Sequence, residues 1–183
     1  MPSQGISQSS LFNVYKNVLA LPGRKHFNKD GHIEISGVFV SLDTGLPISE
    51  AFLAYNESYD ATLVGGRITD SELAHALDNA VKISHPAFFA GYFFKHYGHF
   101  LIESLSRIMP ILLERDSSSA QGEYQELYYF SQWGAFDFSN PSLYFCQIFQ
   151  GLGIDQGSLY EIKFPMLFSE LRIPIQTGGM GFA

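Results

Sequence analysis

A segment near the middle of the chain, residues 97–115, constrains the fold most, because it has the apolar periodicity of a helix. Its leucine and isoleucine side chains recur at i, i+4, i+7 and i+11, at Leu101, Leu105, Ile108 and Leu112. This spacing predicts a helix with one buried apolar stripe. Pro110 has no N–H to donate to the carbonyl of Ser106, so we expect a kink near that point or a break into two segments.

A row of titratable side chains follows a second face of the same predicted helix. His99, Glu103 and Arg107 lie at i, i+4 and i+8, so that their side chains stack along one line, and His96 lies just before the helix begins. Two interpretations fit this row. It can be a ladder of ion pairs on a solvated face, or it can line a cleft. The apolar neighbours, such as Phe94 and Phe100, favour the cleft, because charges in such surroundings are usually paired or functional.

The residues before this helix predict a buried strand. Residues 83–92 form an apolar run rich in aromatic side chains, with a proline after His85. Continuous apolar character indicates burial on both faces, as in a parallel sheet. Ligands of open α/β sheets bind at the carboxyl ends of the strands, so His96 and His99 are predicted to lie where a substrate would bind.

Strands and helices alternate along the rest of the chain. Thr69 and Glu72 form a capping box that predicts a helix over residues 70–81, and residues 141–152 predict another. Strands are predicted at residues 32–42, 127–131, 160–164 and 167–174, whereas residues 11–21 fit either a short strand or a helical turn. The pattern predicts one α/β domain over residues 11–176, with a Rossmann-like, mainly parallel sheet flanked by helices. Residues 1–10 and 177–183 are predicted to be disordered.

Composition restricts the partners and the compartment. The 183 residues are 46% hydrophobic and 15% aromatic, which is typical of a globular domain. The net charge of −7 argues against a nucleic-acid partner. A single cysteine, Cys146, excludes an internal disulfide and suits a reducing cytosol. The start shows no secretory signal and no apolar run reaches the roughly 20 residues of a membrane span, so we expect a cytoplasmic protein whose contact with the inner membrane would be peripheral.

Residues 96–108, HYGHFLIESLSRI, resemble the signature of glycosyltransferase family 61. His99, Glu103 and Arg107 fall on the histidine, the acid and the arginine of that motif. The resemblance implies the N-terminal, acceptor-side lobe of a two-lobe GT-B enzyme for capsule or other polysaccharide biosynthesis. Such an enzyme transfers a sugar, with inversion, from a nucleotide-sugar donor to a glycan or a lipid-linked glycan. Its second lobe mainly holds the donor and is expected beyond Ala183, so this lobe is expected to bind no cofactor.

An inverting transfer needs a base that takes the proton of the acceptor hydroxyl. We slightly favour Glu103 as this base, with His99 orienting or sharing the proton, and the opposite assignment stays open. Arg107 would hold the carboxylate or a substrate anion, and His96 and Tyr97 would contact the substrate. His96, His99 and Glu103 could instead bind zinc, but their spacing differs from the zincin H-E-x-x-H, and we expect no metal.

A non-catalytic protein is the alternative to the enzyme. In this interpretation the chain is a truncated or split lobe that binds a glycan or a partner chain and transfers nothing. A lobe separated from its mate exposes apolar surface, so self-association is expected.

Overall fold

The computed structural model describes residues 11–27, 33–51, 68–117, 126–132 and 136–175. The ends predicted to be disordered, residues 1–10 and 177–183, lie outside the described residues. Residue 176, the last residue of the predicted domain, also lies outside them. Seven strands in the described part form one sheet in the order β3-β2-β1-β7-β4-β5-β6. Their bounds are β1 (Phe12–Phe27), β2 (Ile33–Ser41), β3 (Leu46–Pro47), β4 (Val81–Phe94), β5 (Leu127–Gln132), β6 (Leu159–Glu161) and β7 (Met166–Pro174).

The sheet is mixed, so the predicted Rossmann-like, mainly parallel order is wrong. β4 runs parallel to both β5 and β7, and β5 runs parallel to β6. On the other side, β1 is antiparallel to β2 and β7, and β2 is antiparallel to β3. The physical reason is the segment of residues 11–21, for which the sequence allowed either a short strand or a helical turn. It is part of β1, a 16-residue strand that pairs along its length with β2 and β7 and adds an antiparallel half to the sheet.

The predicted buried strand is confirmed in β4. Residues 87–94 are all buried, and their side chains enter two separate hydrophobic clusters, with Phe89 and Tyr92 in one and Phe88 and Phe93 in the other, which explains the continuous apolar character. The strand begins at Val81, earlier than predicted. Its pairing with β7 shifts between Ile83 and Pro86, because proline cannot donate to the ladder of hydrogen bonds.

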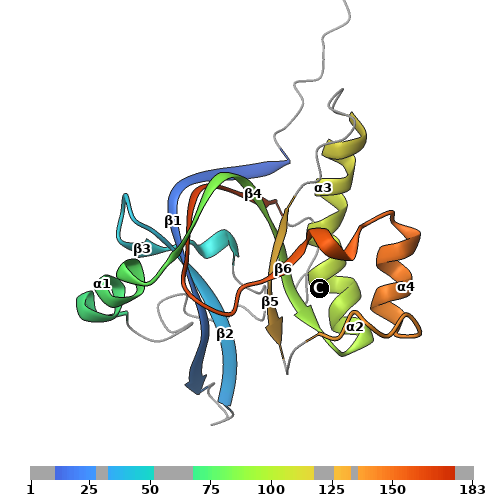
Figure 1. Cartoon of the computed structure of the whole chain (residues 1–183), viewed down its shortest axis with the longest axis horizontal. Helices are drawn as coiled ribbons and strands as arrows, with labels where there is room; N and C mark the ends of the chain where they lie inside the picture. Colours follow the sequence, from blue (N-terminus) through green and yellow to red (C-terminus); the bar gives the residue numbers. More distant parts are fainter. Residues whose placement is uncertain (1–10, 28–32, 52–67, 118–125, 133–135, 176–183) are drawn as a thin grey trace, which may run out of the picture.

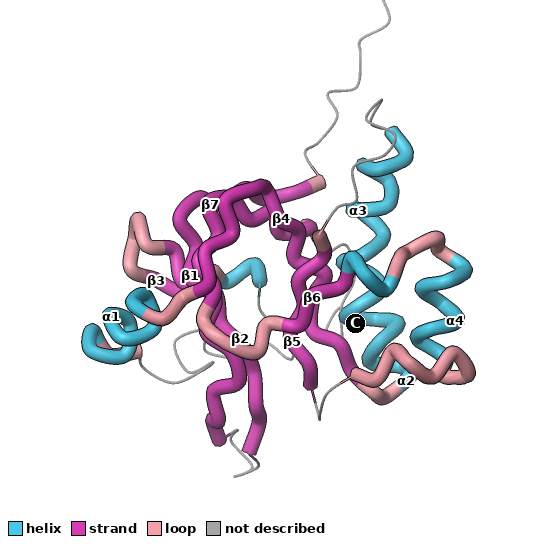
Figure 2. The backbone as a smooth tube through the Cα atoms, viewed as in Figure 1, coloured by secondary structure: helices cyan, strands magenta, loops and turns pink. Residues whose placement is uncertain are grey.

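The sheet curls until β2 lies against β4 and β5, and the curvature of the strands can be followed in Figure 2. The Phe39 ring of β2 lies 4.8 Å from the Phe89 ring and 5.1 Å from the Phe130 ring. Tyr92 donates its hydroxyl hydrogen bond to the carbonyl of Gly37 at 2.9 Å. A Cβ at Gly37 would lie 2.1 Å from the Phe130 ring, so only glycine allows this approach. The curl encloses an aromatic core.

The helices lie at opposite ends of the sheet, as Figure 1 shows for α1 and for the group of α2, α3 and α4. α1 (Asp70–Asp78) begins at the predicted capping box, in which Thr69 accepts from the amide of Glu72. It packs on β1 and β2 through Ala76. α3 (Ser106–Ser117) and α4 (Tyr144–Gly151) pack together on β4 and β5. No helix in the described ranges is long and apolar enough to cross a membrane.

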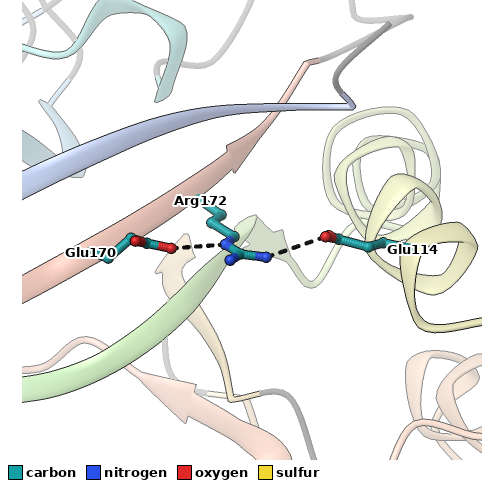
Figure 3. A network of polar contacts seen from close by, with 3 residues as sticks. All are labelled: Glu114, Glu170 and Arg172. Atoms are coloured by element: carbon teal, nitrogen blue, oxygen red, sulfur yellow. Dashed lines mark hydrogen bonds and ion pairs between the residues drawn. The ribbon is translucent and has the colours of Figure 1, made fainter. Parts of the chain in front are cut away.

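Arg172 connects the central strand β7 to α3 (Figure 3). Its Nε donates to Glu170 at 3.0 Å, and its Nη1 donates to Glu114 of α3 at 3.2 Å. The guanidinium also lies 5.4 Å from the centre of the Phe88 ring. These contacts hold the second half of α3 against the sheet, which positions the first half of the helix beside β4.

Candidate active site

The helical segment after β4 changes its geometry along its length. It begins as α2 (Tyr97–His99), continues as the π-helical segment η2 (Phe100–Leu105), and becomes α3 at Ser106. Pro110 lies inside α3 without breaking it. The change from π-helical to α-helical geometry lies at Ser106, four residues earlier, and the helix continues through it without a break, whereas the predicted kink stays a prediction.

The π-helical segment changes which side chains are buried. Ile108 and Leu112 are buried as predicted, but Leu101 and Leu105 are only half-buried. Phe100, Glu103 and Ser104 are buried in η2. A π-helical turn holds more residues than an α-helical turn, so the predicted apolar stripe rotates away from the core in η2, and polar side chains replace it.

η2 packs against the part of β4 that β7 does not reach. The pairing of β4 with β7 ends at Phe88, whereas the pairing with β5 continues to Phe94. Ser104 donates its hydroxyl hydrogen bond to the carbonyl of Tyr92 at 2.6 Å. A side chain of the helix thus satisfies a backbone group of the strand.

Gly91 allows the helix to approach the strand this closely. Its φ of +103° is in a region that side chains with a Cβ rarely adopt. A Cβ there would also lie 2.9 Å from Cδ of Arg107 and 3.5 Å from the carbonyl oxygen of Glu103. A glycine inside an apolar strand is typical of a close backbone approach, so this residue could have been recognised in the sequence.

Glu103 and Arg107 form the buried part of the site, with 0% and 1% of their surface exposed. The solvated-ladder interpretation is therefore wrong for these two residues. The Arg107 guanidinium lies 5.5 Å from the centre of the Phe89 ring, and its Nη1 donates to the carbonyl of Glu50 at 3.1 Å. Burial lowers the pKa of Arg107, whereas the nearby groups of Tyr92 and Glu103 act in the opposite direction.

His96 and His99 form the accessible part of the site. Their Nδ1 atoms lie 2.9 Å apart, and their rings are nearly perpendicular, at 88°. His96 is exposed, and His99 is partly buried beside the Phe94 ring. Burial and the charge of His96 lower the pKa of His99, against an opposing effect of Glu103. His99 is therefore mainly a neutral imidazole at neutral pH.

Comparison of the chain with models of protein families, with curated proteins and with solved structures found no match. The resemblance of residues 96–108 to a glycosyltransferase signature therefore stays a hypothesis.

An aromatic pair from α2 and α4 flanks the histidines. Tyr97 is exposed, and its ring lies 5.1 Å from the Tyr144 ring, edge to face. Tyr144 donates its hydroxyl hydrogen bond to the carbonyl of Phe94 at 3.0 Å, at the last residue of β4. α4 thereby fixes the end of the strand from which His96 follows. Ser104 lies within the motif of residues 96–108, but no periodicity or motif marks Tyr144 or the carbonyl of Glu50 as parts of the site.

All five predicted site residues lie after or beside the carboxyl end of β4. His96 contacts His99, Glu103 acts on the pKa values of His99 and Arg107, and Tyr97 lies at the exposed rim. In the part of the chain that the structure describes, no three His, Cys, Asp or Glu side chains are grouped closely enough to hold a metal ion. The arrangement is a partly exposed imidazole backed by a buried carboxylate, which suits proton transfer.

Proposed function

We propose that this chain is the acceptor-binding lobe of an inverting glycosyltransferase. It would transfer a sugar from a nucleotide-sugar donor to a hydroxyl of a glycan or lipid-linked glycan in polysaccharide biosynthesis, such as capsule synthesis. One observation carries this proposal: the partly exposed imidazole of His99 lies at the carboxyl end of β4, within range of the charge of the buried Glu103. The resemblance of residues 96–108 to family 61 supplies the reaction class.

We assign the base to His99 because of accessibility. Glu103 is fully buried, so a substrate hydroxyl has no direct contact with it in this structure. His99 is partly exposed, and its lowered pKa keeps the imidazole neutral and able to accept a proton. The charge of Glu103 acts to raise the pKa of His99 and so favours the imidazolium that forms. This reverses the slight preference for Glu103 drawn from the sequence.

The remaining roles follow from exposure. Tyr97 and His96 are exposed beside His99 and would contact the acceptor. The mixed sheet does not support a Rossmann-like lobe, so the proposal depends on the site rather than on the fold. The donor would be held by a second lobe, as in the family that the motif resembles, and this lobe would need no cofactor. The proposed location is the cytoplasm, with peripheral contact to the inner membrane where a lipid-linked acceptor would lie.

The test is release of nucleoside diphosphate by the full-length gene product from a panel of nucleotide sugars, with glycan and lipid-linked glycan acceptors. His99→Gln should lower kcat by about 10²–10⁴-fold, the usual contribution of a general base. Glu103→Gln should also nearly abolish transfer while the fold is retained. His75→Gln, at an exposed position on α1, is the matched control and should be neutral.

Two results would count against this proposal separately. Near-normal kcat in His99→Gln would refute the assignment of the base. Sugar transfer that is absent with every donor would refute the function.

A binding module without catalysis is the second candidate, and an exposed apolar patch on α3 favours it. Met109 and Leu113 lie four residues apart on one face of α3, with 41% and 56% of their surface exposed. Such a patch fits a partner chain or a second copy. Sedimentation velocity should then show an association that Leu113→Glu abolishes and that Leu46→Glu, at an exposed leucine of β3, leaves unchanged.

A further inference from the structure

A second cluster of titratable side chains lies at the amino end of β5, away from the candidate active site. Nε2 of His85 in β4 lies 2.6 Å from Oε2 of Glu126, which precedes β5. Tyr128 donates its hydroxyl hydrogen bond to the same oxygen at 2.6 Å, and Tyr160 of β6 also donates to this carboxylate. These four residues form the β5 cluster. The six residues of β5 separate it from the end of β4 by roughly 20 Å, at about 3.3 Å per residue.

The carboxylate at the centre of the β5 cluster is ionised at neutral pH. Burial acts to raise the pKa of Glu126, but the hydrogen bonds from Tyr128, His85 and Tyr160 together lower it below its ordinary value. An ionised carboxylate only accepts, so Nε2 of His85 carries hydrogen. A carboxylate has about four acceptor positions, so these three donors leave room for one from a ligand. The exposed fractions, 29% for the side chain of Glu126 and 51% for that of His85, allow a ligand to reach both.

Tyr160 gives the β5 cluster a flat apolar surface. Its ring stacks on that of Tyr128, with the centroids 5.3 Å apart and an angle of 24° between the planes. The two residues are direct partners in the pairing of β5 with β6, and β6 is the edge strand of the described sheet. Tyr128 is buried and packs edge to face on Phe168 at 4.8 Å, which holds the pair in place. Tyr160 remains 38% exposed, at an edge with which no described strand pairs.

We propose that the β5 cluster is a second binding site, which takes the pyranose ring of a neutral saccharide. The C–H bonds on the face of such a ring carry partial positive charge and would stack on the negative face of the Tyr160 ring. A hydroxyl at the edge of the sugar ring would donate to Glu126. A neighbouring hydroxyl would contact Nδ1 of His85, the ring nitrogen that Glu126 does not engage, and would donate to it or accept from it according to the protonation state of the imidazole.

Charge and shape disfavour other classes of ligand. The ionised Glu126 and the net charge of −7 repel ligands that carry phosphate or carboxylate groups. Quaternary ammonium ions are held by cages of several aromatic rings, whereas Tyr128 and Tyr160 are stacked and present one surface. This inference goes beyond the proposed function, because binding at the β5 cluster needs neither His99 nor a nucleotide-sugar donor.

The test is a titration of the ¹⁵N-labelled full chain with maltotetraose or cellotetraose, without a nucleotide sugar, followed by amide chemical shifts. The shifts should be largest at Glu126, Tyr128 and Tyr160. Tyr160→Val suits an edge strand but removes the ring, and it should weaken binding at least about tenfold, whereas Tyr160→Phe keeps the ring and should stay within about threefold of the wild type. Tyr97→Ala, at the exposed tyrosine of the candidate active site, is the matched control and should leave these shifts unchanged.

Several outcomes would overturn this second site. Absence of shifts with both saccharides, shifts confined to residues 96–99, or an equal loss of binding in Tyr160→Phe and Tyr160→Val would each do so. Adenosine that shifts the β5 cluster when the saccharides do not would overturn the class of ligand. A chain that binds saccharide at the β5 cluster and transfers no sugar would refute the proposed function alone, so the two failures are distinguishable.

Discussion

Replacing Gly91 by alanine should destabilise the protein and disturb the site together. The new Cβ would lie 2.9 Å from Cδ of Arg107, closer than carbon atoms normally approach. Arg107 has little freedom to move, because its side chain is 1% exposed and its Nη1 is hydrogen-bonded to the carbonyl of Glu50. The φ of +103° adds backbone strain that glycine does not have.

The expected loss can be worked from these contacts. A non-glycine residue in a sparsely populated backbone region costs about 1–3 kcal/mol. Displacing Arg107 would weaken a hydrogen bond from a charged donor, which is worth about 1.5–3 kcal/mol. We therefore expect Gly91→Ala to lower the free energy of unfolding by about 3–5 kcal/mol, which corresponds to a Tm decrease of about 6–20 °C for a protein of this size.

Chemical and thermal denaturation of the variant and a matched control would measure this loss. Gly151→Ala, at the end of α4, is the control, because a Cβ at Gly151 meets no atom within 4 Å. The control should change stability by less than about 1 kcal/mol, since alanine favours a helix over glycine. A Gly91→Ala protein within about 0.5 kcal/mol of the wild type would refute the close approach of Arg107 to β4.

Two further perturbations test the site and the fold. Because the folded-state pKa of His99 is lowered, the folded protein binds fewer protons there than the unfolded chain, so wild-type stability should fall as the pH drops below about 6.5. The His99→Gln protein should lack the part of this pH dependence that comes from His99. If the free energies of unfolding of the two proteins change in parallel between about pH 7 and pH 5, the lowered pKa is contradicted. Thr69→Ala removes the hydroxyl that accepts from the amide of Glu72 and should cost about 1 kcal/mol in denaturant unfolding. An unchanged midpoint would show that this cap does not stabilise α1.

Patterns within a few residues were enough to predict the local structure. The capping box at Thr69 located the start of α1, and the apolar run of residues 83–92 predicted a buried strand, which β4 is from Ala87 onward. The row of His99, Glu103 and Arg107 was also recognisable, because helical spacing brings such residues to one side. The preference for Glu103 as the base could not be tested against accessibility, since periodicity does not show which polar face becomes covered.

The sequence by itself determined where α1 begins, that residues 83–92 contain a buried strand, and which titratable side chains lie along one helix. Only the tertiary structure decided the direction of β1, the mixed order of the sheet, and the burial of Glu103 and Arg107. Helical periodicity and caps depend on neighbours within about four residues. The pairing of Val14 with Arg172 instead joins opposite ends of the described chain. Burial of the site likewise requires β4 and the 3-10 helix Ser49–Ala51 to meet Arg107, and no local pattern encodes that meeting.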